Sequence, residues 1–279
     1  MADGLDIRRI LVALEPSESG RAALAAAAEM AARLEAELIG VYVEDIDLLN
    51  MAALPFGREY STETTGGRDV DRGAMVRALR GEAGRLRREM EAAARREHVR
   101  WSFRVARGRV AAELLTASED ADVMIVGRAS HTTPRRVRVG STTRTVVSRG
   151  KHTVIVTQTA GIVARPVLVW FDGSRASVRA LVTGARLAAE DHKNIVVLLA
   201  AADADEAELL RAPAAALLAE LGLDARYAVP ATFDVAGVLD LMRRERCRTL
   251  VAAAESALLG DEAAVAVLER VDCPVVVVR

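Results

Sequence analysis

Short apolar runs alternate with longer helix-favouring segments along the first half of the chain. Runs of this length favour strands buried in a parallel sheet, whereas the longer segments favour helices. The predicted strands cover residues 10–14, 37–43, 101–105, 123–126 and 152–157. The predicted helices cover residues 21–34, 77–98 and 110–119, and a last one begins at Gly140. This alternation predicts an α/β domain with five parallel strands.

The same order of elements starts again after residue 158. Residues 167–174, VLVWFDGS, superpose on residues 10–17, ILVALEPS, and Ala180-Leu181 then falls on Ala23-Leu24. Further matches keep this order while the offset between matching positions shrinks, as in a divergent tandem repeat with shortened loops. We therefore predict two tandem domains, with the first at 1–158, a linker at 159–165 and the second at 166–279.

The connection at residues 46–75 shows no periodic pattern and carries Pro55, Gly57, Gly66 and Gly67. Connections of this length are uncommon in compact domains, so we interpret it as a lid or an interaction segment. Apolar residues near and within the following helix recur at spacings of four and seven and should face the sheet, namely Met75, Leu79, Leu86 and Met90. The charges of that helix are interpreted as a solvated face, or alternatively as a partner-binding face.

Composition narrows the classes of function. The 279 residues include 38 basic and 39 acidic ones, for a net charge of -1, so no global field recruits nucleic acid or an anionic membrane. Aromatic residues make up 3%, which argues against base-stacking surfaces. The chain shows no signal-peptide core and no apolar run of transmembrane length. Its two cysteines, Cys247 and Cys273, form no disulfide framework, which favours a cytoplasmic location.

Residues 122–148 carry the clearest candidate chemistry. The predicted strand ends at Gly127, and a polar loop follows with Arg128, Ser130, His131, Arg135, Arg136 and Arg138. Gly140, Ser141, Thr142 and Thr143 then open a helix. Unpaired N–H groups and the positive dipole end favour an anion at a helix start, and glycine lets it approach the backbone closely. The stretch therefore predicts a phosphate-binding loop, although two glycines that merely punctuate a turn are the alternative.

The spacing of this stretch resembles a known motif. Two residues separate Gly127 from Ser130, and nine separate Ser130 from Gly140-Ser141. This resembles the universal stress protein nucleotide motif G-x2-G-x9-G-[ST], with Ser130 in place of the second glycine. If that position needs a positive φ, serine costs roughly 1–2 kcal/mol, or about tenfold in affinity. The loop arginines at 135, 136 and 138 could recover part of this by pairing with phosphate, or they could simply be solvated.

The resemblance to universal stress proteins covers nearly the whole chain. It includes the ILVAL strand followed by a carboxylate, the segment VARGRVAAELL at 105–115, the glycine motif, and the closing DCPVVVV of the second half. It implies tandem Rossmann-like domains of the adenine-nucleotide alpha hydrolase type. The first domain should then hold ATP or ADP, with or without Mg²⁺, at the carboxyl edge of its sheet.

The implied site is carried over residue by residue. The resemblance places the phosphates among Gly127, Ser130, Gly140, Ser141 and Thr142, and Arg128 and Thr143 are predicted to belong to the nucleotide site as well. It places adenine and ribose beside Ala13, Leu14 and either Val43 or Val41. Glu15 stands where the family usually has Asp and could reach a phosphate-bound metal ion; a helix N-terminal charge is the alternative role. Thr143 could equally be an ordinary residue of the first helical turn.

The second half departs from the motif, and we interpret it as a degenerate domain without nucleotide. Ala253 stands in place of Gly127, and either Asp261-Glu262 or Gly260-Asp261 replaces Gly140-Ser141. Acidic side chains at a helix start would repel phosphate. The terminal strands at 154–157 and 275–278 are flat and apolar, so the two repeats should pair through them as an internal pseudo-dimer. A further dimer of whole chains stays open.

Three functions follow from these observations. The first is a stress-response protein that binds ATP or ADP in its first domain as a nucleotide-linked sensor or regulatory module. The second is a nucleotide-free interaction scaffold of the same fold. The third, a weak ATP hydrolase, has less support because the sequence assigns no base or nucleophile. No nucleic-acid or membrane partner is expected.

Overall fold

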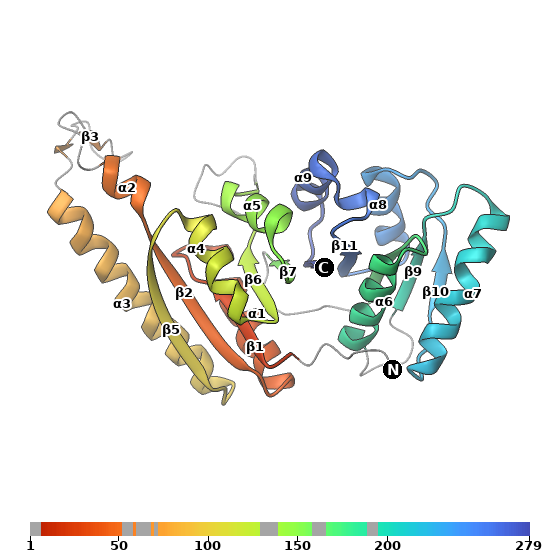
Figure 1. Cartoon of the computed structure of the whole chain (residues 1–279), viewed down its shortest axis with the longest axis horizontal. Coiled ribbons are helices and arrows are strands. Elements are labelled where there is room, and N and C mark those ends of the chain that lie inside the picture. Colours follow the sequence, from red (N-terminus) through yellow and green to blue (C-terminus); the bar gives the residue numbers. More distant parts are fainter. Residues whose placement is uncertain are drawn as a thin grey trace.

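A computed structural model describes residues 7–51, 58–59, 68–69, 72–128, 139–157, 166–188 and 195–279. Ten strands form one sheet in the order β10-β9-β8-β11-β12-β7-β6-β1-β2-β5, which runs the length of the molecule (Figure 1). The strands are β1 (Arg9–Ala13), β2 (Glu37–Asp45), β5 (Trp101–Gly108), β6 (Val123–Gly127), β7 (Thr153–Thr157), β8 (Val167–Phe171), β9 (Ile195–Leu199), β10 (Arg226–Ala228), β11 (Thr249–Ala253) and β12 (Val275–Val278). A separate pair joins β3 (Arg58–Glu59) to β4 (Arg68–Asp69).

Each half of the chain contributes five strands to the large sheet, which are parallel within the half. The halves meet where β7 pairs with β12, the one antiparallel contact described in this sheet. We call this junction the seam. Val276 lies opposite Ile155 there, and Val277 lies opposite Val154. The predicted fold of two tandem five-stranded α/β domains is confirmed.

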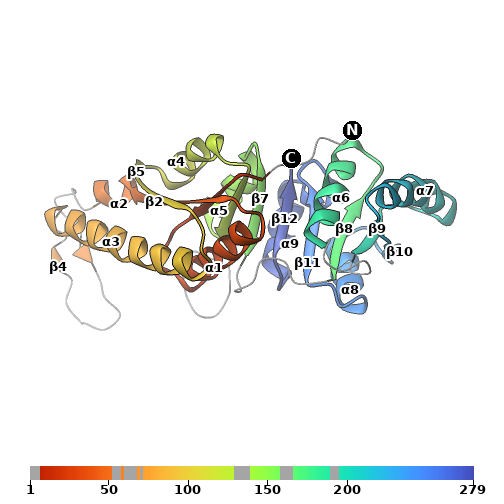
Figure 2. The ribbon, with the colours of Figure 1, turned by 90° about the horizontal axis from the view of Figure 1, so that it is seen from below.

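Helices cover both faces of the sheet (Figures 1 and 2). One face carries α1 (Glu18–Arg33), α3 (Arg72–Arg96), α6 (Arg175–Ala188) and α7 (Ala204–Glu220). The other carries α4 (Val110–Ala117), α5 (Ser141–Arg149), α8 (Val235–Arg244) and α9 (Asp261–Arg270). Short 3-10 turns follow α4 at Ser118–Asp120 and precede α9 at Ala257–Leu259.

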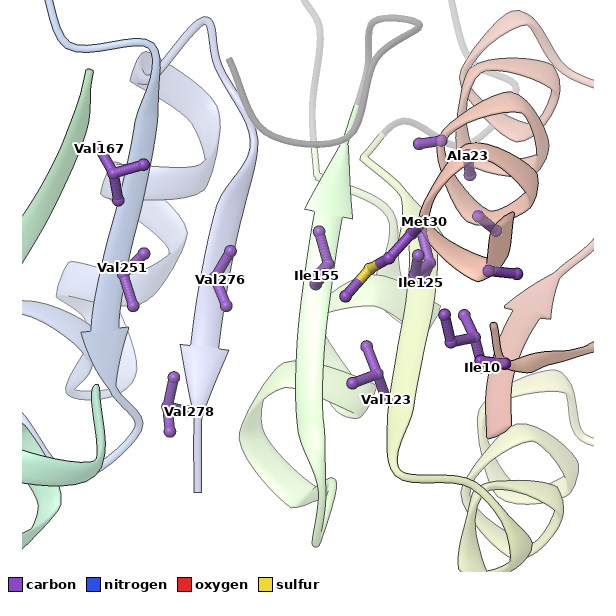
Figure 3. Packing of buried hydrophobic residues seen from close by; sticks show 14 of the residues in the cluster. Ile10, Ala23, Met30, Val123, Ile125, Ile155, Val167, Val251, Val276 and Val278 are labelled. Carbon is purple, nitrogen blue, oxygen red and sulfur yellow. The ribbon is translucent and has the colours of Figure 1, made fainter. Parts of the chain in front are cut away.

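The apolar core continues across the seam. Figure 3 shows Ile155 of β7 and Val276 of β12 facing each other, with Met30 of α1 close to Ile155. These side chains belong to one buried cluster that contains residues of both halves. Because burial of apolar surface is the main favourable term in folding, the two repeats stabilise each other through this shared core.

Two helices begin earlier than the sequence predicts. Helix α1 begins at Glu18 because the Ser17 hydroxyl accepts the N–H of Gly20 at 2.9 Å and caps the helix. Helix α3 begins at Arg72, and its residues Leu79, Leu86 and Met90 are buried, as the spacing predicted.

The irregular connection predicted at 46–75 is corrected at both ends. Residues Ile46–Met51 form the short helix α2, whose first turn receives a cap because the Asp47 N–H donates to Asp45 Oδ1 at 2.9 Å. The segment also contains the β3–β4 pair and the first turn of α3. Its remaining residues, 52–57, 60–67 and 70–71, lie outside the described part of the chain, so its interpretation as a lid or interaction segment stays a prediction.

Among the described residues, no helix is both long and apolar enough to cross a membrane.

Candidate functional site

A cavity of about 740 Å³ lies at the carboxyl ends of β1, β2 and β6. Open α/β sheets bind ligands at this edge. Nearly all the predicted site residues that the structure describes line the cavity: Ala13, Leu14, Glu15, Val41, Val43, Gly127, Gly140, Thr142 and Thr143. The size lies within the range for small-molecule sites.

Glu15 is held at the start of α1. The hydroxyls of Ser17 and Ser19 donate to its Oε1 at 2.6 and 3.1 Å. The same oxygen lies so near Gly127 that a Cβ added there would be 2.9 Å from it, and 3.0 Å from Ser19 Oγ. Glycine at 127 is therefore explained by this close approach. Glu15 serves the helix N-terminus and also borders the cavity.

The turn from β6 to α5 is tied together by Gly127 and Gly140. The buried Thr143 hydroxyl donates to Gly127 O at 2.8 Å, and the Gly140 N–H donates to Arg128 O at 3.1 Å. Gly140 is the N-cap of α5 and provides no side-chain cap. The first-turn amides of α5 therefore have no capping side chain from Gly140, an arrangement that suits an anion.

The remaining predicted phosphate ligands fall outside the cavity or outside the described residues. Ser141 is exposed and does not line the cavity. Ser130, His131 and the loop arginines at 135, 136 and 138 lie in 129–138, which the structure does not describe.

The prediction that Arg128 belongs to the nucleotide site is wrong for its side chain. Arg128 is only 6% exposed, and its Nη1 donates to the carbonyls of Leu268 at 3.1 Å and Val271 at 2.6 Å, in the second half. These carbonyls lie at the C-terminal end of α9, where the helix dipole favours a cation. Sequence reasoning placed Arg128 by its neighbour Gly127 and had no signal for a partner in the other half.

Sequence reasoning also missed a polar wall of the cavity. The Tyr42 hydroxyl donates to Glu82 Oε2 at 3.0 Å, and both residues line the cavity together with Glu89. The interpretation of the α3 charges as a solvated face is therefore wrong for Glu82. A signal was present, because Glu82 and Glu89 lie on the same helical face as the core residues Leu79 and Leu86.

Tyr42 makes a pH-dependent contribution to stability. Burial, reinforced by the Glu82 charge, raises the pKa of Tyr42 above its ordinary value of 10.0. Because the folded-state pKa exceeds the unfolded one, this contribution is complete below the ordinary value and is lost as pH rises through the folded value. Tyr42→Phe should cost about 1 kcal/mol at neutral pH, since the Glu82 carboxylate loses the hydrogen bond from the tyrosine hydroxyl.

The measurement is urea unfolding of the wild type and Tyr42→Phe at pH 8 and at about pH 10.5. We expect the free energy of unfolding to fall more steeply with pH in the wild type. Tyr227 and the two half-buried cysteines, whose pKa values are also raised, titrate in both proteins and cancel in the comparison. Equal slopes would contradict the assignment.

The second half repeats the turn with different residues. Ala253 ends β11 where Gly127 ends β6, and Gly260 is the N-cap of α9 with φ -59 and ψ 157. Gly140 has nearly the same backbone, with φ -59 and ψ 149. The structural counterpart of Gly140-Ser141 is therefore Gly260-Asp261, which settles the two alignments that the sequence left open.

Among the described residues, no group of three or more His, Cys, Asp and Glu side chains is placed to hold a metal ion. The cavity wall does include the carboxylates of Glu15 and Asp45. Mg²⁺ commonly takes one or two carboxylates and completes its shell with water and substrate phosphate.

Solved structures of similar fold cover both halves. A universal stress protein from Archaeoglobus fulgidus matches with a TM-score of 0.76 and 15% identity, over 97% of this chain and 98% of that one. A putative universal stress protein from Pseudomonas aeruginosa UCBPP-PA14 matches with a TM-score of 0.59 and 19% identity, over 98% of this chain and 94% of that one. A functionally unknown protein from Pseudomonas aeruginosa PAO1 matches with a TM-score of 0.59 and 17% identity, over 98% of this chain and 93% of that one. At these identities the likeness shows the fold alone.

Sequence comparison identifies the family. No curated protein matches the chain. The model of the universal stress protein family matches residues 6–158, more than half of the chain and the part that contains the cavity. The chain therefore belongs to the universal stress protein family.

Proposed function

We propose that the chain binds ATP or ADP at the carboxyl edge of its first half and acts in the cytoplasm as a nucleotide-linked sensor or regulatory module. The supporting observation is the cavity of about 740 Å³, which combines apolar walls with the glycine-capped start of α5. Free thiols at Cys247 and Cys273 agree with a reducing compartment.

The cavity offers different chemistry to the two ends of a nucleotide. Ala13, Leu14, Val41 and Val43 supply apolar surface for adenine and ribose. Gly127 and the Gly140–Thr142 turn would hold the phosphates, through the first-turn amides of α5 and the Thr142 hydroxyl. Mg²⁺, where it accompanies the phosphates, would neutralise their charge beside Glu15.

We further propose that only the first domain, 1–158, binds nucleotide, and that the second, 166–279, is degenerate. Ala253 puts a methyl group where Gly127 leaves none, and Asp261 begins α9 where Ser141 begins α5. A carboxylate in the first turn competes with an anionic ligand for the helix dipole.

Isothermal titration calorimetry with ATP tests this proposal on protein freed of copurified nucleotide. We expect one ATP per chain in the wild type. Gly140→Glu should weaken binding by at least about 100-fold, since it puts a charge and a side chain at the phosphate end. Gly260→Glu is the matched control at the corresponding N-cap of the second half. A Cβ added there meets only Ala257 O, at 3.8 Å, so α9 stays in place and the variant should bind like the wild type.

Other outcomes contradict the proposal in distinguishable ways. Two ATP per chain would show that the second domain is functional. Equal affinity in Gly140→Glu would place the ligand elsewhere. No binding by folded wild type would favour the nucleotide-free interaction scaffold. The observation that supports this alternative is the Glu15 carboxylate, which lies close to Gly127.

A further inference from the structure

Arg128 links the candidate nucleotide site to the second half. It directly follows Gly127, which lines the cavity, yet its buried guanidinium reaches the carbonyls of Leu268 and Val271. Leu268, one of its two acceptors, lies 140 positions away from Arg128 in the chain. One side chain thus connects the wall of the first-half cavity with the end of a second-half helix.

The backbone of Arg128 is also fixed by two hydrogen bonds. Its N–H donates to Thr157 O at 2.9 Å, and its carbonyl accepts the N–H of Gly140 at 3.1 Å. Gly140 is the N-cap of α5 and borders the cavity. Any displacement of Arg128 therefore moves a hydrogen-bond acceptor of the turn that is proposed to hold phosphate.

The guanidinium depends on α9 for its stability. Burial lowers the pKa of Arg128, while the nearby charges of Asp272 and Glu269 raise it. Its Nε has no hydrogen-bond partner within the described part of the chain. A buried cation that loses its acceptors is strongly unfavourable, so Arg128 stays in place only while the end of α9 does.

Helix α9 is itself the second-half counterpart of α5, since Gly260 caps it with the backbone conformation of Gly140. The start of α9 would be a binding position in an intact repeat, and its end holds Arg128. A change in the second half that shifts α9 would thereby be transmitted to the first-half turn through Arg128.

We propose that Arg128 is a positioning residue through which the second half regulates nucleotide affinity in the first. The inference rests on the proposed nucleotide site. It gives the degenerate domain a role, that of the regulatory partner of this site. It also reassigns Arg128 from a nucleotide-binding residue to a link between the domains.

The first test compares ATP affinity by calorimetry in full-length variants. Arg128→Met keeps the length of the side chain and removes its donors, and we expect affinity to fall about tenfold or more. Arg128→Lys keeps one cationic donor and should recover part of the loss. The matched control is Arg279→Met. The Arg279 Nη2 also crosses the seam and donates to Val147 O near the end of α5, but Arg279 does not line the cavity.

The second test uses the wild-type protein and needs no variant. Coupling between sites is reciprocal, so ATP binding should strengthen the hold on α9. Hydrogen exchange with and without saturating ATP should show slower exchange in the last turn of α9, around Leu268–Val271, in the wild type. A merely structural Arg128 would leave this region unchanged by ATP.

The outcomes separate this inference from the function on which it rests. No ATP binding by the wild type would overturn the proposed function. Binding that leaves α9 exchange unchanged, or an Arg128→Met affinity equal to that of Arg279→Met, would overturn the link alone. Weaker binding in Arg128→Met together with ATP-dependent protection of α9 supports it.

Discussion

We expect Val276→Asp to destabilise the chain by at least about 4 kcal/mol, enough to unfold much of it at room temperature. Val276 is fully buried on β12 opposite Ile155, in the apolar cluster shared by the two halves. A carboxylate placed there lies among the apolar side chains of that cluster and loses its hydration, which costs far more than the lost methyl groups. The loss should open the seam first.

Guanidinium denaturation and size-exclusion chromatography measure this effect. Val105→Asp is the matched control, because Val105 is 49% exposed on the edge strand β5 and should tolerate the change within about 1 kcal/mol. Should Val276→Asp not fold at all, Val276→Ala provides a graded version with an expected loss of about 1–3 kcal/mol. Similar midpoints for Val276→Ala and the wild type would show that the seam is not a shared core.

Gly20→Ala should lower the free energy of unfolding by about 1–3 kcal/mol and weaken nucleotide binding as well. A Cβ added at Gly20 would lie 2.3 Å from the backbone oxygen of Glu15 and 2.5 Å from its Cγ. Because real Cβ atoms do not approach so closely, the start of α1 must move away from Glu15. Glu15 borders both the cavity and Gly127, so the displacement reaches the candidate site.

The same substitution elsewhere has the opposite expected sign. Gly81 lies in the middle of α3, and a Cβ added there meets nothing within 4 Å. Gly81→Ala should therefore stabilise the chain by about 0.4–1 kcal/mol, since alanine favours the helix and restricts the unfolded chain. Thermal unfolding measures the change in stability of both variants, and ATP titration measures the loss of binding in Gly20→Ala. Stabilisation by Gly20→Ala would show that the close contact with Glu15 is absent in solution.

The arrangement of strands and helices could be predicted from the sequence because it depends on local patterns. A short apolar run predicts a buried strand wherever it lies, and the repeated order of such runs predicts two similar domains. The spacing of Gly127 and Gly140 likewise predicted a turn at the carboxyl edge of the sheet, and both glycines line the cavity. The start of α1 was less accurate because the Ser17 cap extends this helix beyond its periodic part, and the short helix α2 with its Asp45 cap was not predicted.

The wall of the cavity was only partly predictable. The family resemblance placed Ala13, Leu14, and Val43 or Val41 beside the nucleotide, and all four line the cavity because the parallel strands that carry them end at the same edge. Tyr42 and Glu82 could not be paired from the sequence, because the position of α3 against β2 determines whether a helix carboxylate meets a strand hydroxyl. That position results from packing between segments that are distant in the chain.

The sequence by itself determined the α/β class, the tandem repeat, the glycine-bounded turn at the carboxyl edge of the sheet and the family. The tertiary structure alone decided that Gly260 corresponds to Gly140, that Glu15 contacts the hydroxyls of Ser17 and Ser19, and that Arg128 points away from the cavity. The physical reason is the range of the interactions. Periodicity and glycine spacing act over a few residues, whereas the acceptors of a buried guanidinium are chosen by the packing of a helix from the other half of the chain.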